Sequence, residues 1–202
     1  MKAYIVAPIV AIIISLPHIV HAQGVTPPAV PDAIQVPPGY KPYLMAHAVG
    51  TQGYMCVQAG SAFTWAPFGP QATLFNGDNE QILTHFLSPT PYSLLPGPTW
   101  QSSRDSSVVW GQAIASSSDP AFVAPGAIPW LLLEAAVVGD GPNGGAKLLP
   151  TRYIQRVNTV EGAAPSTGCS EPAHVKNRAL VYYEADYVFY KEKARNVSDD
   201  AR

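Results

Sequence analysis

Short apolar runs separated by turn residues fill the chain from Tyr40 to Tyr190, with a new run roughly every 8 to 15 positions. Twenty-one prolines and sixteen glycines interrupt the sequence, and no stretch holds the period of 3.6 residues that an amphipathic helix requires. This spacing predicts an all-β domain with little helix. An antiparallel β-sandwich is the simplest form, with a jelly-roll-like or barrel-like arrangement as the alternatives. The predicted strands span residues 43–49, 52–58, 61–66, 71–76, 80–87, 107–115, 130–138, 151–159 and 180–190.

The last of these runs has the clearest strand pattern, because alternate residues differ in polarity. One face, which we expect to pack in the core, consists of Tyr183, Ala185, Tyr187 and Phe189. The run 130–138 is apolar except at Glu134, which is typical of a strand covered on both faces. The dipeptides Asn76-Gly77 and Asn143-Gly144 lie between predicted strands and favour hairpin turns.

The chain divides into four predicted segments. Lys2 precedes an apolar run that ends in the small-residue pattern of a cleavage site, so the N-terminus is a secretory signal peptide. Prolines interrupt this run, so we expect no membrane span. A segment with five prolines follows and predicts an extended arm on the surface. The signal peptide, the Pro-rich arm, the single β domain and a charged flexible tail span residues 1–22, 23–39, 40–190 and 191–202.

Cys56 and Cys169 are the two cysteines of the chain. In an oxidising compartment two cysteines most simply form a disulfide; the alternative is a free nucleophilic thiol. Asn196 begins the glycosylation sequon Asn196-Val197-Ser198 within the predicted tail. Together with the signal peptide, these features predict a secreted, extracellular protein, in the cell wall or periplasm depending on the organism.

Charge is sparse, with 12 basic and 14 acidic residues in 202. A chain without basic excess has little with which to neutralise phosphates, so nucleic-acid binding is not expected. In so neutral a domain each internal charge is informative.

A series of short motifs follows the chain. They are His47 with Tyr54-Met55-Cys56, Ala72-Thr73-Leu74-Phe75, Gly97-Pro98-Thr99-Trp100, the run from Gly126 to Leu133, the run from Tyr153 to Thr159, Gly168-Cys169 and Ala185-Asp186-Tyr187. Together they resemble the domain of unknown function 3455 family over about residues 36 to 190. The resemblance implies a small secreted protein and brings no established activity.

Members of that family often carry the label malate dehydrogenase, and one motif tests it. Residues 139–144 match the pattern G-x-G-x-x-G. A dinucleotide site needs a helix to begin at that loop, so that its N-terminus binds the pyrophosphate. Here Pro150 and a strand-like run follow instead, which favours a hairpin loop and argues against an NAD-dependent dehydrogenase.

Four residues form a hypothetical catalytic pocket: His47, His174, Glu134 and Arg156. The disulfide would bring the two histidines near each other, either as ordinary hydrogen-bonded residues or as a shared metal or acid–base site. Glu134 lies in an apolar strand and would face Arg152 or Arg156 on the next strand, depending on the register. An ion pair is one interpretation, and a general acid or base is the other.

The aromatic residues suggest a second kind of site. Trp100 and Trp110 are surrounded by serines and by Arg104-Asp105, so we expect them to be the exposed tryptophans, able to stack on sugar rings. Asn158 would orient a polar ligand, and Asp186 is either an ion-pair partner or a ligand-binding residue.

The resulting functional hypothesis is non-catalytic binding of a glycan or small ligand, without a cofactor. The alternative is an extracellular enzyme built on the hypothetical catalytic pocket, with or without a metal. The oligomeric state is not specified by these patterns.

Overall fold

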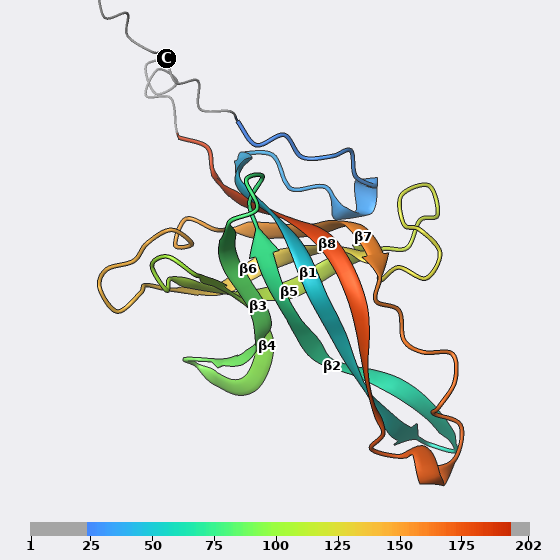
Figure 1. Ribbon diagram of the computed structural model, residues 1–202. Helices are drawn as coiled ribbons and strands as arrows, with labels where there is room; N and C mark the ends of the chain where they lie inside the picture. The colour runs from blue at the N-terminus through green and yellow to red at the C-terminus, as the bar shows by residue number, and fades with distance from the viewer. Residues whose placement is uncertain (1–23, 195–202) are drawn as a thin grey trace, which may run out of the picture.

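A computed structural model describes residues 24–194, so the predicted signal peptide and Asn196 lie outside the described residues. Eight antiparallel strands form a closed barrel in which each strand pairs with the next in sequence and β8 pairs with β1 (Figure 1). The strands are β1 (Tyr40–Ala59), β2 (Ala62–Phe75), β3 (Gln81–Thr90), β4 (Ser93–Ser102), β5 (Val108–Ser117), β6 (Trp130–Gly139), β7 (Tyr153–Glu161) and β8 (Arg178–Glu192). Two short 3-10 turns, η1 (Asp32–Ile34) and η2 (Pro172–His174), complete the structure. The all-β prediction is confirmed, in its barrel-like form.

The predicted strand boundaries differ from the structure at two kinds of residue, glycine and proline. Residues 43–49 and 52–58 belong to the single strand β1, because Gly50 is not a turn residue. A Cβ on Gly50 would lie 2.2 Å from the Gln71 carbonyl oxygen, so glycine permits close strand approach there. Residues 61–66 and 71–76 likewise merge, with Phe75 as the last residue, into β2. Strand β4 was not predicted, because prolines such as those within it are typical of loops.

The barrel interior is the main core, and it includes the predicted face of the last strand. Tyr183, Ala185, Tyr187 and Phe189 are each at most 1% exposed, as expected. They pack with residues of the other strands, including Ala46, Ala48, Leu74, Leu83, Trp100, Val109, Leu133 and Ile154. The alternation of β8 therefore places every second side chain inside the barrel.

The Pro-rich arm covers a second core on the outside of the barrel. Ile34 is fully buried there, against Trp130, Leu132 and Val188. The Gln155 side-chain amide donates to the Ile34 carbonyl at 2.7 Å and fixes the arm on β7. The first half of β6 is thus covered on both faces, as its apolar run predicts, whereas Glu134 and Ala136 are exposed.

The predicted disulfide is present. Cys56 on β1 is bonded to Cys169 in the segment between β7 and β8, with their Cα atoms 5.4 Å apart. Next to it, the Cys56 N–H donates to the Asn177 carbonyl, and the Lys176 N–H donates to the Cys56 carbonyl. The bridge therefore holds this long segment against the end of β1. Within residues 24–194, no helix is long and apolar enough to cross a membrane.

The G-x-G-x-x-G segment begins at Gly139, the last residue of β6, and continues as a loop with no helix after it. Gly141 of this segment and Gly145 directly after it allow close packing on Asp105, since a Cβ on either would lie about 2 Å or less from the Asp105 carbonyl oxygen. Burial raises the pKa of Asp105, but hydrogen bonds from the Lys147 N–H and from Ser107 outweigh it and hold that pKa well below its usual range. The glycines serve loop packing, as the hairpin interpretation predicts.

Candidate functional site

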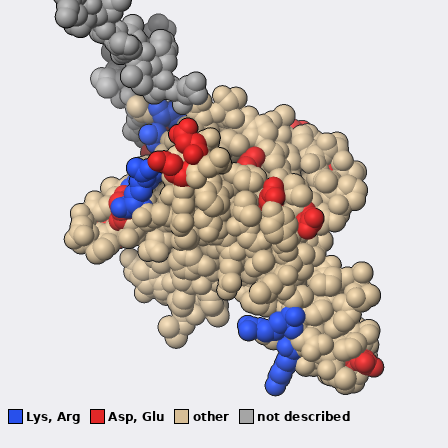
Figure 2. Space-filling model, in the orientation of Figure 1, with Lys and Arg blue, Asp and Glu red and all other residues tan. Residues whose placement is uncertain are grey.

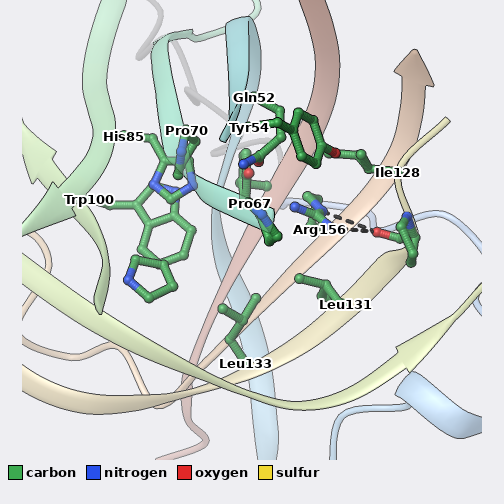
Figure 3. A pocket seen from close by; sticks show the side chains of 13 residues that line it. Gln52, Tyr54, Pro67, Pro70, His85, Trp100, Ile128, Leu131, Leu133 and Arg156 are labelled. Atoms are coloured by element: carbon green, nitrogen blue, oxygen red, sulfur yellow. Dashed lines mark hydrogen bonds between the residues drawn. The ribbon is translucent and has the colours of Figure 1, made fainter. Parts of the chain in front are cut away.

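The barrel interior contains a pocket of about 360 Å³ at one end. We call it the barrel pocket and define it by its lining residues. They come from seven of the eight strands and from the segment before β6. The lining residues are Gln52, Tyr54, Pro67, Pro70, His85, Pro98, Trp100, Ile128, Pro129, Leu131, Leu133, Arg156 and Tyr187 (Figure 3).

Prolines explain why the barrel is open at this end. The β2–β3 pairing begins only at Ala72, beyond Pro67 and Pro70, and the β4–β5 pairing begins at Thr99, just after Pro98. Proline has no N–H to donate to a strand ladder, so these residues interrupt the pairing between neighbouring strands. The unpaired strand ends leave space that the core side chains do not fill.

His85 and Trp100 form one wall of the barrel pocket. Their rings stack at a centroid distance of 4.1 Å and an interplanar angle of 6°. The His85 Nδ1 atom lies 2.8 Å from the Thr99 carbonyl oxygen. A carbonyl only accepts hydrogen bonds, so Nδ1 carries the proton and Nε2 is left as an acceptor in the neutral ring. Among the described residues, Nε2 has no hydrogen-bond partner.

The ionisation of His85 follows from its surroundings. Burial lowers its pKa to about 3, with the hydrogen bond to Thr99 opposing this and the positive charge of Arg156 adding to it. At neutral pH the imidazole is therefore uncharged. Burial also raises the pKa of the Tyr187 hydroxyl and that of the Tyr54 hydroxyl, so both phenols are neutral as well.

Arg156 lies across the pocket from His85 and Trp100 (Figure 3). Its Nε and Nη2 atoms donate to the Pro129 carbonyl oxygen at 3.1 and 2.7 Å. Of the pocket-lining residues, Arg156 is the only one with a formal charge at neutral pH. Among the described residues, no carboxylate forms an ion pair with it. The site therefore combines apolar walls with one unneutralised cation.

A family model described as a protein of unknown function, DUF3455, matches residues 37–191. The chain belongs to the DUF3455 family. This confirms the resemblance seen in the sequence motifs, and every residue that lines the barrel pocket falls within the matched range. No curated protein and no solved structure matches the chain. Family membership brings no activity, so function has to be argued from the pocket.

The structure of this DUF3455 chain does not assemble the hypothetical catalytic pocket. His174 lies beside the disulfide, where Asn177 bonds both to it and to Cys56. His47 is nine residues from Cys56 along β1, a distance of roughly 30 Å in an extended strand. In the β1–β8 register His47 stands opposite Asp186, whereas Met55, next to Cys56, stands opposite Arg178. The two histidines therefore lie near different parts of this strand pair, and the prediction that the disulfide brings them together is wrong.

Glu134 is also placed differently from the prediction. It is exposed and stands opposite Tyr153, one residue away from the register that would pair it with Arg152. Arg152 pairs instead with Glu192 at 3.3 Å, and Arg156 points into the barrel. The predicted ion pair of Glu134 with either arginine is therefore wrong, and of the four proposed catalytic residues only Arg156 lines the barrel pocket.

The predicted aromatic surface of Trp100 and Trp110 is likewise absent. Trp100 is 0% exposed and lies inside the barrel. Trp110 faces outward but is half-buried, with its indole N–H donating to the Ser88 hydroxyl at 2.9 Å. Successive residues of a strand face opposite sides, and the β4–β5 register puts the two tryptophans on different faces of the sheet.

Three predicted residues do come together, on the outside of the barrel. His47 Nδ1 lies 2.9 Å from an Asp186 carboxylate oxygen, and the Asn158 side-chain amide donates to the other oxygen at 2.8 Å. Glu184 lies 3.5 Å from His47 Nε2. We call these four residues the outer cluster. No group of three metal-ligating side chains suited to a metal ion occurs in residues 24–194.

Sequence reasoning missed the role of His85 and the prolines around the pocket. The position of His85 depends on strand β4, which pairs His85 with Trp100. This strand was not predicted, because Pro96 and Pro98 within it are typical of a loop. The one available signal was the motif Gly97-Pro98-Thr99-Trp100, which the family resemblance singled out without assigning it a structure.

Proposed function

We propose that this protein is a secreted, non-catalytic binding protein that holds a small, largely apolar molecule in the barrel pocket. The observation that carries the proposal is the pocket itself. Its volume of about 360 Å³ falls within the range of small-molecule sites. Closed barrels of about eight strands have interiors wide enough to hold one small ligand.

The lining supports a ligand that is mostly apolar. Four prolines, Ile128, Leu131 and Leu133 supply aliphatic surface, and Trp100 is the largest aromatic side chain. The polar groups are few: Arg156, neutral His85, Gln52 and two tyrosine hydroxyls. Binding sites for small molecules generally combine apolar walls with a few placed polar groups in this way.

Secretion is part of the proposal and is supported by two observations. The disulfide between Cys56 and Cys169 persists in oxidising compartments. The N-terminal segment has the pattern of a signal peptide. Charged side chains are scattered in small groups on the face drawn in Figure 2, which favours a small uncharged or weakly charged partner over a nucleic acid.

Titration with the neutral fluorescent probe N-phenyl-1-naphthylamine tests this proposal. We expect saturable binding of one probe per chain, with a rise in fluorescence as the probe leaves water. The Leu131→Trp variant fills the pocket and should weaken binding at least tenfold. The matched control Ala136→Trp adds the same side chain at an exposed position of the same strand and should bind as the wild type does.

Two results would overturn the proposal. One is the lack of saturable binding by the folded wild-type protein. The other is equal binding by Leu131→Trp and Ala136→Trp, since the probe would then occupy a site other than the barrel pocket.

A further inference from the structure

We propose that the ligand of the barrel pocket is a small apolar monocarboxylate whose carboxylate binds the Arg156 guanidinium. This inference rests on the proposed function and specifies the chemical class of the ligand.

The barrel pocket has one charged lining residue, Arg156, and this residue is half-buried. Its guanidinium acts electrostatically on Tyr54, His85 and Tyr187, and no carboxylate acts on these three groups. A partly buried cation without a counter-ion is costly, and an anion that enters the pocket removes that cost.

A guanidinium has five N–H donors, and the Pro129 carbonyl takes one from Nε and one from Nη2. Nη1 and the second N–H of Nη2 make no hydrogen bond to a carboxylate among the described residues. Burial raises the pKa of the Tyr187 hydroxyl, and this neutral hydroxyl is near enough to Arg156 for a hydrogen bond to lower that pKa in part. The edge formed by Nη1 and Nη2 has the fork geometry that binds the two oxygens of a carboxylate in parallel. Pro129 also fixes the plane of the guanidinium before a ligand arrives.

The barrel pocket carries a single positive charge at neutral pH, because its histidine and its tyrosine hydroxyls are uncharged. A monoanion is neutralised by it. A dianion such as a phosphate monoester would keep a net negative charge beside buried neutral groups, so a carboxylate fits better.

Figure 3 shows Pro67 between Arg156 and the wall of His85 and Trp100, with Leu131 and Leu133 below them. A ligand anchored on Arg156 therefore extends its body over aliphatic and aromatic side chains. Burial of that body is favourable only if it is apolar.

A matched set of ligands tests the inference on the wild-type protein. Naphthalene-1-acetate, naphthalene-1-acetamide and 2-(1-naphthyl)ethylammonium have closely similar bodies and differ in charge. Each is titrated against bound N-phenyl-1-naphthylamine. We expect the carboxylate to displace the probe at least tenfold more tightly than the amide, with little displacement by the ammonium ion. 1-Naphthyl phosphate should compete less well than the carboxylate.

Arg156→Gln should remove the preference for carboxylate over amide. Arg152→Gln is the charge-matched control on the segment leading into β7, because Arg152 is exposed and pairs with Glu192. It should keep the full preference. The comparison of ligands on the wild type remains decisive even if Arg156→Gln fails to fold.

The outcomes separate the two proposals. If the neutral probe binds in the pocket but carboxylate and amide compete equally, the inference is wrong and the proposed function stands. A tighter phosphate than carboxylate would also overturn the inference. If the probe does not bind at all, both proposals fall.

Discussion

The barrel pocket and the outer cluster lie on opposite faces of the same strands, and their charged groups have different partners. On the outer face, His47 is surrounded by the carboxylates of Glu184 and Asp186. On the inner face, Arg156 contacts a backbone carbonyl and pairs with no carboxylate among the described residues. In the outer cluster the titratable side chains contact one another, whereas the cation of the barrel pocket has no carboxylate partner within the described residues.

This difference distinguishes polar side chains that bond to each other within the fold from polar side chains that remain available to a ligand. In the outer cluster both carboxylate oxygens of Asp186 have a side-chain partner, and Asn158 adopts a positive φ of 51° at the irregularity in β7 where it reaches Asp186. This network links the three strands β1, β7 and β8 and leaves Asp186 little capacity to bind a ligand. The barrel pocket keeps free donors on Arg156 and a free acceptor on His85, and these are the groups that a ligand can use.

The largest expected effect distinguishes an inner from an outer tryptophan. Trp100→Ala removes a fully buried side chain stacked on His85 and should lower the free energy of unfolding by about 3 to 5 kcal/mol. Trp110→Ala is the matched control, because Trp110 is half-buried on the outer face, and it should cost about 1 to 2 kcal/mol. Urea denaturation of both variants measures the difference.

Equal losses in the two variants would contradict the inner position of Trp100. Probe binding adds a second readout for variants that remain folded. Trp100→Ala enlarges the barrel pocket and should change affinity, whereas Trp110→Ala should leave the affinity for N-phenyl-1-naphthylamine unchanged.

The next largest effect is a change of stability with pH, which tests whether His85 is neutral in the folded protein. Burial lowers the pKa of His85 from 6.5 to about 3. Between these two pH values, His85 is protonated in the unfolded chain but not in the folded chain. The stability that His85 contributes is present above pH 6.5 and is lost as the pH falls toward 3. Two units below 6.5, the loss from this residue is about 2 to 3 kcal/mol, at 1.4 kcal/mol per unit.

His85→Gln isolates this contribution, because glutamine does not titrate and its amide can still donate to the Thr99 carbonyl. Urea denaturation between pH 7 and pH 4.5 should show a steeper loss of stability in the wild type than in the variant. Parallel curves would mean that His85 takes up its proton at the same pH in the folded and the unfolded protein, and that burial does not hold its pKa down.

The features that could be predicted from the sequence are those set by local pattern. Alternation in residues 180–190 identified the inner face of β8, and the presence of only two cysteines in a chain predicted to be secreted identified the disulfide. The Asn76-Gly77 turn between β2 and β3 has the expected chemistry, with the Asn76 side chain accepting from the Asp78 and Glu80 N–H groups. Each of these depends on residues close in sequence or on a single possible pairing.

The barrel pocket could not be predicted, because it depends on strand register. Glu134 was assigned to an arginine partner, but the loop of residues 140–152 sets a register in which Tyr153 stands opposite. One residue of register moves a side chain from one face of a sheet to the other. Arg156, predicted as a catalytic residue, lines the barrel pocket without a carboxylate partner among the described residues, because the predicted partner Glu134 lies on the outer face of β6.

The smallest expected effect comes from the outer cluster. Asp186→Asn removes one carboxylate from His47, whose side chain is 47% exposed, and keeps an oxygen that can accept from Asn158. Exposed ion pairs contribute little, so the free energy of unfolding should fall by less than about 1 kcal/mol, and less still at high salt. The affinity for naphthalene-1-acetate should stay within about twofold of the wild type, because screening weakens a charge on the far face of the sheet. The comparison fails if Asp186→Asn weakens carboxylate binding as strongly as Arg156→Gln does. The two faces of β8 would then form one coupled site, and the outer cluster would have to be counted as part of the ligand-binding machinery.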